Sequence, residues 1–276
     1  MNQRHSFNLK LSRMAPLVPA ALLLLGAGPL LAEATCTPPQ SMKAQLQGKP
    51  TAAAFKELGV WFADQQQYAC AADAFASSLQ TEPDQKDAPH VAFMFGVSLY
   101  FSGDVKGATA ALQEAEQLGY RDIKLHIVLA TIFDSAQTTK EAEVEWRAAL
   151  TFDPESSAAL DGLSNDLILD GDFNGVIAEL ENPRLLGQRT PQQSFNLAAA
   201  YAGTAKLDEA VNVLRDGLNT SPDSLPLANR LASLLVQINR PDEALTVLDL
   251  ALAQHPDDPE VKQNMAKVMQ MLGAVK

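Results

Sequence analysis

The sequence is short of cysteine, of basic residues and of long uninterrupted apolar runs, and these shortages exclude several classes of protein. With 2 cysteines in 276 residues, the chain cannot build a cysteine-rich zinc site or a disulfide-dense scaffold. Its 21 lysines and arginines face 33 aspartates and glutamates, for a formal net charge of -12, which disfavours nucleic acid and anionic lipid as partners. The 47% hydrophobic content nevertheless excludes a disordered chain and allows a sizeable core.

The first 34 residues have the features of an export signal. Three basic residues precede an uncharged stretch, residues 14–32, that is rich in leucine and alanine. Ala32 and Ala34 then place small residues at the −3 and −1 positions of a cleavage site. Proline and glycine interrupt the stretch, which argues against an uncleaved membrane anchor. We therefore expect a signal peptide over residues 1–34 and a periplasmic or secreted protein without a membrane span after cleavage.

The two cysteines, Cys36 and Cys70, are 34 residues apart and suit one disulfide bond in an oxidising compartment. Their spacing is not the Cys-x-x-Cys of thiol redox enzymes. Closing a loop of this size would stabilise the fold by about 4 kcal/mol in the chain-entropy description. We therefore predict a Cys36–Cys70 bond that ties an N-terminal arm, residues 35–51, to the first structured unit.

A period of 34 residues organises the chain from Ala52 onward. Each unit has large apolar residues at positions 7 and 11, a small residue at position 8 and apolar residues at positions 20 and 24, and four units carry proline at position 32. Apolar residues at helical spacing, with small residues where two backbones approach, predict an antiparallel pair of helices in each unit. Because one hairpin cannot bury both of its apolar faces, the units must stack into a continuous solenoid. The units start at residues 52, 89, 123, 157, 191 and 225.

This pattern resembles the tetratricopeptide repeat family over residues 52–258. The resemblance implies an all-α fold, a right-handed superhelical α-solenoid of about six helix hairpins, followed by a capping helix and tail over residues 259–276. The sequence departs from the pattern at two places. Three extra residues around 86–88 lengthen one loop. Pro183, at position 27 of the fourth unit, should end that unit's second helix near Asn182 and make the array irregular there.

Residues 170–181 also match the calcium loop of an EF-hand, which competes with the repeat frame. A calcium-binding module would need this segment to form a loop whose oxygen ligands converge on one ion. In the repeat frame a helix begins inside the segment and would separate Asn174 from Glu181 by two turns, about 10 Å. The calcium site stays an alternative at this point, and its side-chain ligands would be Asp170, Asp172, Asn174 and Glu181.

No sequence motif indicates catalysis or a cofactor. The chain has no nucleophile elbow, no phosphate-binding loop and no histidine pair at the spacing of metal ligands. Outside the calcium alternative, we therefore predict a protein that is not an enzyme and that uses no cofactor and no metal.

The resemblance to tetratricopeptide repeats implies a partner-binding groove on the concave side of the solenoid, lined by positions 2, 5, 9 and 12 of each first helix. Over the first two units this set is apolar and aromatic, and over the next two it is polar enough to bind a peptide backbone. Whether Phe93 and Tyr100 reach the groove or pack against neighbouring helices depends on the curvature of the array. The groove candidates are Lys56, Val60, Ala63, His90, Phe93, Val97, Tyr100, Lys124, Ile127, Thr131, Asp134, Asp161, Asn165, Ile168, Gln192, Phe195, Ala199, Asn229, Ser233 and Val236.

The leading interpretation is a periplasmic scaffold or adaptor that binds a peptide segment or helix of another envelope protein in this groove. By analogy with exported proteins of similar pattern, it would serve a secretion or assembly machine. Clamping of a free C-terminal carboxylate is disfavoured, because Val60 stands where an asparagine is wanted. The alternative outside protein binding is an envelope glycan-binding protein that uses the region of Phe93, Tyr100 and Asp161.

Overall fold

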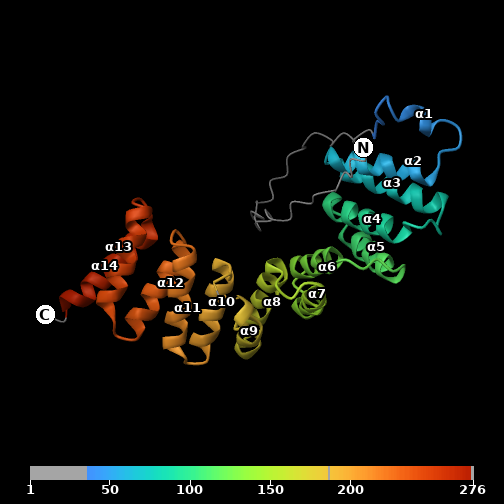
Figure 1. The fold of residues 1–276 in the computed structure, drawn as a ribbon. Helices are drawn as coiled ribbons and strands as arrows, with labels where there is room; N and C mark the ends of the chain where they lie inside the picture. The colour runs from blue at the N-terminus through green and yellow to red at the C-terminus, as the bar shows by residue number, and fades with distance from the viewer. Residues whose placement is uncertain (1–35, 186, 275–276) are drawn as a thin grey trace, which may run out of the picture. The chain divides into compact units, whose positions relative to one another are not determined.

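The computed structural model describes residues 36–185 and 187–274, and the regular elements in these ranges are all helices (Figure 1). The predicted signal peptide lies outside the described residues. Within the described ranges, no helix combines the length and the hydrophobicity that a bilayer span needs. The helices are α1 (Lys43–Leu46), α2 (Ala52–Asp64), α3 (Tyr68–Thr81), α4 (Ala88–Ser102), α5 (Val105–Gln117), α6 (Ile123–Ser135), α7 (Thr139–Phe152), α8 (Ser157–Leu169), α9 (Phe173–Leu180), the 3-10 helix η2 (Pro183–Leu185), α10 (Pro191–Gly203), α11 (Leu207–Thr220), α12 (Leu225–Gln237), α13 (Pro241–Gln254) and α14 (Pro259–Ala274).

Consecutive helices pair as hairpins, beginning with α2 and α3, and each hairpin packs on the next. The second helix of each hairpin contacts the first helix of the following one, and the first helices from α4 to α14 also contact one another in succession. The predicted all-α solenoid of stacked hairpins is therefore confirmed. We call the exposed side of α2, α4, α6, α8, α10, α12 and α14 the first-helix surface.

Every hairpin turns through a residue with positive φ at position 15 of its unit. The φ values of these six residues lie between 59 and 95°. Two of them are glycine, for which this left-handed conformation carries no steric cost, whereas the other four accept it as part of the turn. The 34-residue period is thus present in the backbone as well as in the side chains. The six residues are Gln66, Gly103, Gln137, Gly171, Ala205 and Asn239.

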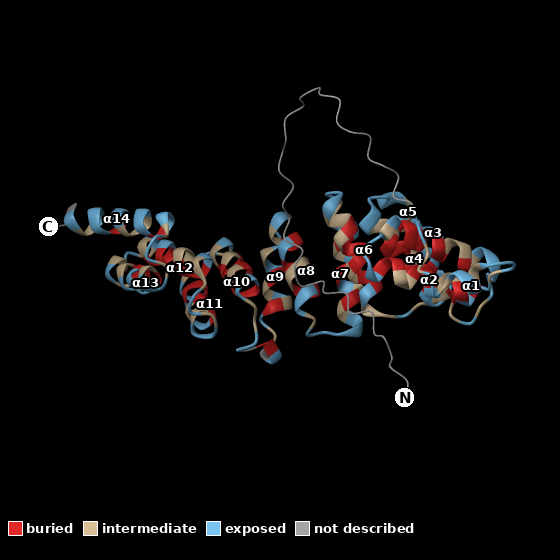
Figure 2. Ribbon diagram, turned by 90° about the horizontal axis from the view of Figure 1, so that it is seen from above, coloured by how far each residue is buried: buried red, intermediate tan, exposed pale blue. Residues whose placement is uncertain are grey.

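Small residues at position 8 let the two helices of a hairpin approach closely. A Cβ atom at Gly59 would lie 2.6 Å from the ring of Phe75, and one at Gly96 would lie 2.7 Å from Leu112. Figure 2 shows buried residues along the sides where neighbouring helices meet. One hydrophobic cluster runs from Ala130 in α6 into α14, so the later hairpins share a continuous core as stacking requires.

The predicted disulfide bond between Cys36 and Cys70 is confirmed, with Cα atoms 5.4 Å apart. Cys70 lies on α3 and is 1% exposed. The bond therefore joins the arm that precedes α2 to the buried side of the first hairpin.

The early end predicted for the fourth unit's second helix is also confirmed. Helix α9 has 8 residues and ends at Leu180, two residues before the predicted Asn182, whereas α11 in the next unit has 14 residues. A 3-10 turn over residues 183–185 follows it. The side chain of Arg189 donates a hydrogen bond of 2.8 Å to the backbone carbonyl of Leu180, which satisfies a carbonyl that the shortened helix leaves free.

Candidate functional site

At the amino-terminal end of the first-helix surface, a loop residue covers part of the predicted groove. Tyr120, between α5 and α6, stacks on Phe93 with ring centroids 4.5 Å apart and ring planes at 11°. His90 stacks with the same tyrosine at 5.9 Å. Phe93 and Val97 are only 5% and 4% exposed. The prediction that these two residues line an open groove is therefore wrong, because they belong to the packed interior.

Tyr120 is a residue that the groove positions miss. It stands at position 32 of the second unit, where four other units carry proline, and this departure was the available signal. Burial, followed by the negative charge of Asp122, raises the pKa of the Tyr120 phenol above its ordinary value. The phenol therefore stays neutral and acts as an aromatic cover.

The other candidates on α2 and α4 are also engaged within the fold. Lys56 donates a hydrogen bond to the carboxylate of Asp87, in the lengthened loop before α4. This bond lowers the pKa of Asp87. Val60 and Tyr100 are half-buried, and the ring of Tyr100 lies 5.4 Å from that of Phe101. At this end of the surface His90 stays exposed, whereas Lys56, Val60 and Tyr100 are only partly accessible.

The candidates on α6 differ in their exposure. Lys124 is exposed, and Ile127 and Thr131 are half-buried. The Thr131 hydroxyl donates to the carbonyl of Ile127 at 2.7 Å. Asp134 accepts a hydrogen bond of 3.2 Å from Nε1 of Trp146, which fills the space beside α8. Lys124 is thus the most accessible of the four.

Asp134 adjoins Asp166 on α8, and Oδ1 of Asp134 and Oδ2 of Asp166 are buried without a hydrogen-bond donor among the described residues, so the two carboxyl groups need one proton between them. Asp166 is 3% exposed. Burial is the largest cause that raises the pKa of each group, and the charge of Asp134 helps to raise the pKa of Asp166 to about 7. The pair therefore links α6 to α8 through a shared proton. Asp166 was missed because position 10 is not a groove position.

A network of amide side chains spans α8 and α10. Asn196 is 3% exposed, and its Nδ2 donates to Oγ of Ser164 at 2.9 Å and to Oδ1 of Asn165 at 2.8 Å. Nε2 of Gln192 donates to Oδ1 of Asn165 at 3.2 Å and to Oδ1 of Asn196 at 3.0 Å. Because Asn165 and Gln192 are exposed, the network presents further amide donors and acceptors to a ligand.

The predicted groove residue Asp161 adjoins this network. Its Oδ1 accepts a hydrogen bond of 2.9 Å from the hydroxyl of Thr190, which also forms a capping box with Gln193 at the start of α10. Burial is the main cause that raises the pKa of Asp161. The residue therefore fixes the loop after the shortened α9 to α8, and it is only partly available to a partner.

Two adjoining pockets continue the first-helix surface across α12 and α14. One has a volume of about 460 Å³ and the other about 240 Å³, and both are lined by Asn229, Ser233 and Asn264. Nδ2 of Asn264 donates to Oδ1 of Asn229 at 3.0 Å, so the amide row extends into the last helix. The larger pocket adds Phe195 and charged groups, and the smaller one adds the apolar side chains of Val236, Leu248, Val268 and Met271.

Arg230 lines the larger pocket, and its Nε is a buried donor without a hydrogen-bond partner among the described residues. The contributions of Arg230, Asn264 and Met271 were missed by the sequence analysis. Arg230 occupies position 6, which is not a groove position, and the repeat pattern predicts α14 only as a capping helix. The pockets combine amides, one unsatisfied cationic donor and an apolar wall, as binding sites for peptides commonly do.

The calcium alternative is contradicted by the position of its ligands. Asp172 caps α9 by accepting from the backbone N–H of Gly175 at 2.9 Å, so Asn174 is helical. Asp170 pairs with Lys140 on α7. Glu181 lies beyond the far end of the helix. Within the described part of the chain, no three carboxylate, histidine or cysteine side chains are grouped as metal ligands.

Known proteins resemble this chain in repeat pattern and in fold. A sequence profile described as tetratricopeptide repeat matches residues 201–268. This match supports the resemblance of the chain to the tetratricopeptide repeat family. Proteins with this fold serve as protein-interaction scaffolds and are generally not enzymes.

A curated relative is similar to this chain over part of its length. Cellulose synthase operon protein C of Xanthomonas axonopodis pv. citri (strain 306) is 27% identical over 179 residues, which make up 62% of this chain and 12% of that protein. The chain therefore spans only a small part of that relative.

Solved structures show the same fold. A tetratricopeptide repeat protein from Parabacteroides merdae ATCC 43184 is 13% identical, with a TM-score of 0.59 over 80% of this chain and 86% of that chain. PilF of Pseudomonas aeruginosa is 14% identical, with a TM-score of 0.56 over 78% of this chain and 97% of that chain. At these identities the likeness concerns the fold alone.

Proposed function

We propose that this protein is an exported adaptor that binds an extended segment of a partner protein on the first-helix surface of α8, α10, α12 and α14. The observation that carries the proposal is the continuity of binding groups there. Exposed amides on α8 and α10 lead to the Asn229–Asn264 pair, and this pair lies between two adjoining pockets.

The chemistry of this surface suits a peptide more than a glycan. Amide side chains pair with the N–H and C=O groups of an extended backbone, and the apolar pocket beside Met271 accepts a hydrophobic side chain. The glycan alternative uses the region of Phe93, Tyr100 and Asp161, and within that region Phe93 lies beneath Tyr120.

The location of the partner is part of the same proposal. The basic, apolar and small-residue pattern of residues 1–34 supports export, and the disulfide bond suits an oxidising compartment. The relative named for a cellulose synthase operon supports a partner within an export or assembly machine of the cell envelope. Fractionation and N-terminal sequencing of the mature protein test this part, and a mature chain that starts at Met1 would contradict cleavage.

Site-specific photo-crosslinking in living cells tests the binding surface. A photoreactive residue in place of Ser233, which is exposed between the two pockets, should trap a protein of defined mass. The matched control carries the same photoreactive residue at Asn212, which is exposed on the second helix α11. Ser233→Arg should abolish binding of the trapped partner.

Two results would contradict the proposal. Equal trapping from Ser233 and Asn212 would show that the first-helix surface has no special role. Glycan binding that Ser233→Arg removes, without any protein adduct, would favour the glycan-binding alternative.

A further inference from the structure

Ion pairs join a second helix to the following hairpin at two junctions, between the third and fourth hairpins and between the fifth and sixth. Lys140, at position 18 of the third unit, pairs with Asp170, at position 14 of the fourth. The second unit also has a lysine at position 18, Lys106, but position 14 of the third unit is Ala136. Lys106 forms no ion pair with any residue in the described ranges.

The same difference in ion pairing to the next unit is found at position 25 of the repeat. Arg147 pairs with Glu179 of the next unit, and Arg215 pairs with Glu243. The second unit has Gln113 at position 25. The junction between the second and third hairpins therefore has neither kind of ion pair among the described residues, as is also true of the first and fourth junctions. Of these three junctions, it alone has a lysine at position 18.

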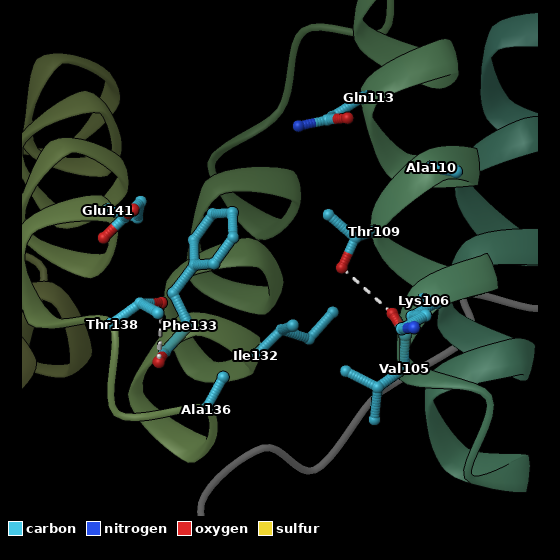
Figure 3. Close-up of a pocket in the computed structure, with 10 residues that line it drawn as sticks. All are labelled: Val105, Lys106, Thr109, Ala110, Gln113, Ile132, Phe133, Ala136, Thr138 and Glu141. Carbon is cyan, nitrogen blue, oxygen red and sulfur yellow. Dashed lines mark hydrogen bonds between the residues drawn. The ribbon is translucent and has the colours of Figure 1, made fainter.

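The helices at this junction are also packed less closely. Among the described hairpins, α5 and α6 contact each other less than any other second helix and following first helix do. The loop between them contains Leu118, which is 44% exposed. A pocket of about 400 Å³ lies between α5 and the end of α6 (Figure 3).

The walls of this pocket are apolar, and its polar groups lie at the sides. Val105, which is 41% exposed, and Ile132 and Phe133 form much of the apolar wall. Figure 3 shows Lys106 and Glu141 on opposite sides of the pocket. Ala136, which stands at the repeat position that Asp170 occupies in the next unit, also lines the pocket. Lys106 and the position that lacks a carboxylate partner for it therefore face the same pocket.

We propose that this pocket is a docking site for a partner segment that presents a carboxylate beside a bulky apolar side chain. The carboxylate pairs with Lys106, as Asp170 pairs with Lys140, and the apolar side chain fills the space between Val105 and Phe133. Charge complementarity selects this occupant on the Lys106 side of the pocket, because Lys106 is the one cationic lining residue and forms no ion pair in the described ranges, whereas Glu141 lies on the opposite side. None of the lining residues is a predicted groove residue, so the site is separate from the first-helix surface.

The test uses the full exported chain and random dodecapeptides displayed on phage as the probe. Ala136→Asp supplies the missing carboxylate from within the protein, so this variant serves as the counter-selection bait. We expect peptides selected by the wild-type protein to carry Asp or Glu next to Leu, Ile, Phe or Met. Their synthetic versions should bind Ala136→Asp and Lys106→Glu about tenfold more weakly or worse.

Matched variants separate this site from the proposed adaptor surface. Lys86→Glu, a charge reversal at an exposed lysine outside the pocket, and Ser233→Arg should leave binding of the selected peptides unchanged, and circular dichroism should show that all variants are folded. Where Ala136→Asp fails to fold, Lys106→Ala replaces it as the bait. The proposal would be overturned if no peptide were enriched over the counter-bait, if basic peptides were enriched, or if Ser233→Arg abolished binding of the selected peptides. Loss of binding through Ser233→Arg would remain compatible with the proposed adaptor surface.

Discussion

The first two hairpins and the later hairpins follow the same repeat but present different first-helix surfaces. On α4, Tyr120 covers Phe93, and on α2, Lys56 is paired with Asp87. On α8 and α10, in contrast, the equivalent face presents exposed amides that are linked in a network. Equal positions in a repeat therefore do not have equal exposure, because residues outside those positions decide what covers them.

The two regions are also held together by different means. The first hairpin carries the disulfide bond between the arm and α3, and the ring of Tyr68 stacks on Phe101 of the next hairpin at 4.9 Å. The later hairpins are joined by ion pairs, by the Asp134–Asp166 contact and by the amide network. The amino-terminal region should thus respond to redox conditions, and the later region should respond to pH and salt.

Removal of the disulfide bond should have the largest effect on this comparison. Cys36→Ala/Cys70→Ala should lower the free energy of unfolding by about 2–4 kcal/mol, because the bond restricts a long loop of the unfolded chain. Urea denaturation measures the loss. Hydrogen exchange should show that the backbone amides of α2 and α3 lose protection, whereas those of α10 to α13 stay as protected as in the wild-type protein.

Reduction of the wild-type protein serves as the control for this prediction. A reductant should reproduce the shift in the wild-type protein and have no effect on the double variant. Equal loss of protection in α12 and α13 would show that the two regions unfold as one unit. The disulfide bond would then not stabilise the amino-terminal region separately from the later hairpins.

The shared proton between Asp134 and Asp166 should produce a smaller, pH-dependent effect. The folded-state pKa of Asp166 is raised to about 7, above about 3.9 in the unfolded chain. The folded state therefore binds more protons between these values, and the free energy of unfolding falls as the pH rises through that range. Asp166→Asn cannot ionise, and it should be more stable than the wild-type protein by about 1–2 kcal/mol at about pH 8.

Thermal unfolding of both proteins from about pH 5 to about pH 8 checks this prediction. The difference between variant and wild type isolates the effect, since general charge repulsion in an acidic chain affects both alike. Asp249→Asn, at an exposed position of α13, should show no such difference. A variant that is less stable than wild type at the alkaline end would contradict the shared proton.

The ion pairs between hairpins should have the smallest effect. Arg147→Ala removes the pair with Glu179 and should cost about 0.5 kcal/mol, since exposed pairs contribute little. Gln113→Ala, at the same repeat position in the second unit, should be nearly neutral. Urea denaturation at low and high salt measures the free energy of unfolding of both variants. Equal losses of this free energy in Arg147→Ala and Gln113→Ala would show that the ion pair has no role in joining the hairpins.

Much of the fold could be predicted from local patterns, but less of the site could. The spacing of apolar residues predicted the hairpins, and Pro183 predicted the early end of α9, because helix geometry and the missing proline N–H act over a few residues. The exposure of Phe93, Asp166 and Arg230 could not be predicted in this way. It depends on contacts with Tyr120, with Asp134 and with α14, which lie outside the helices that carry these three residues.

The sequence by itself determined that 34-residue units fold as paired helices and that Cys36 has Cys70 as its partner. It also contained the lysine without a carboxylate at the second junction, since Lys106 and Ala136 can be read from the repeat. Only the tertiary structure decided which faces stay open and where pockets form. The period of a helix is a local property, whereas exposure depends on how closely separate hairpins approach, and small differences in side-chain volume and charge at each junction set that approach.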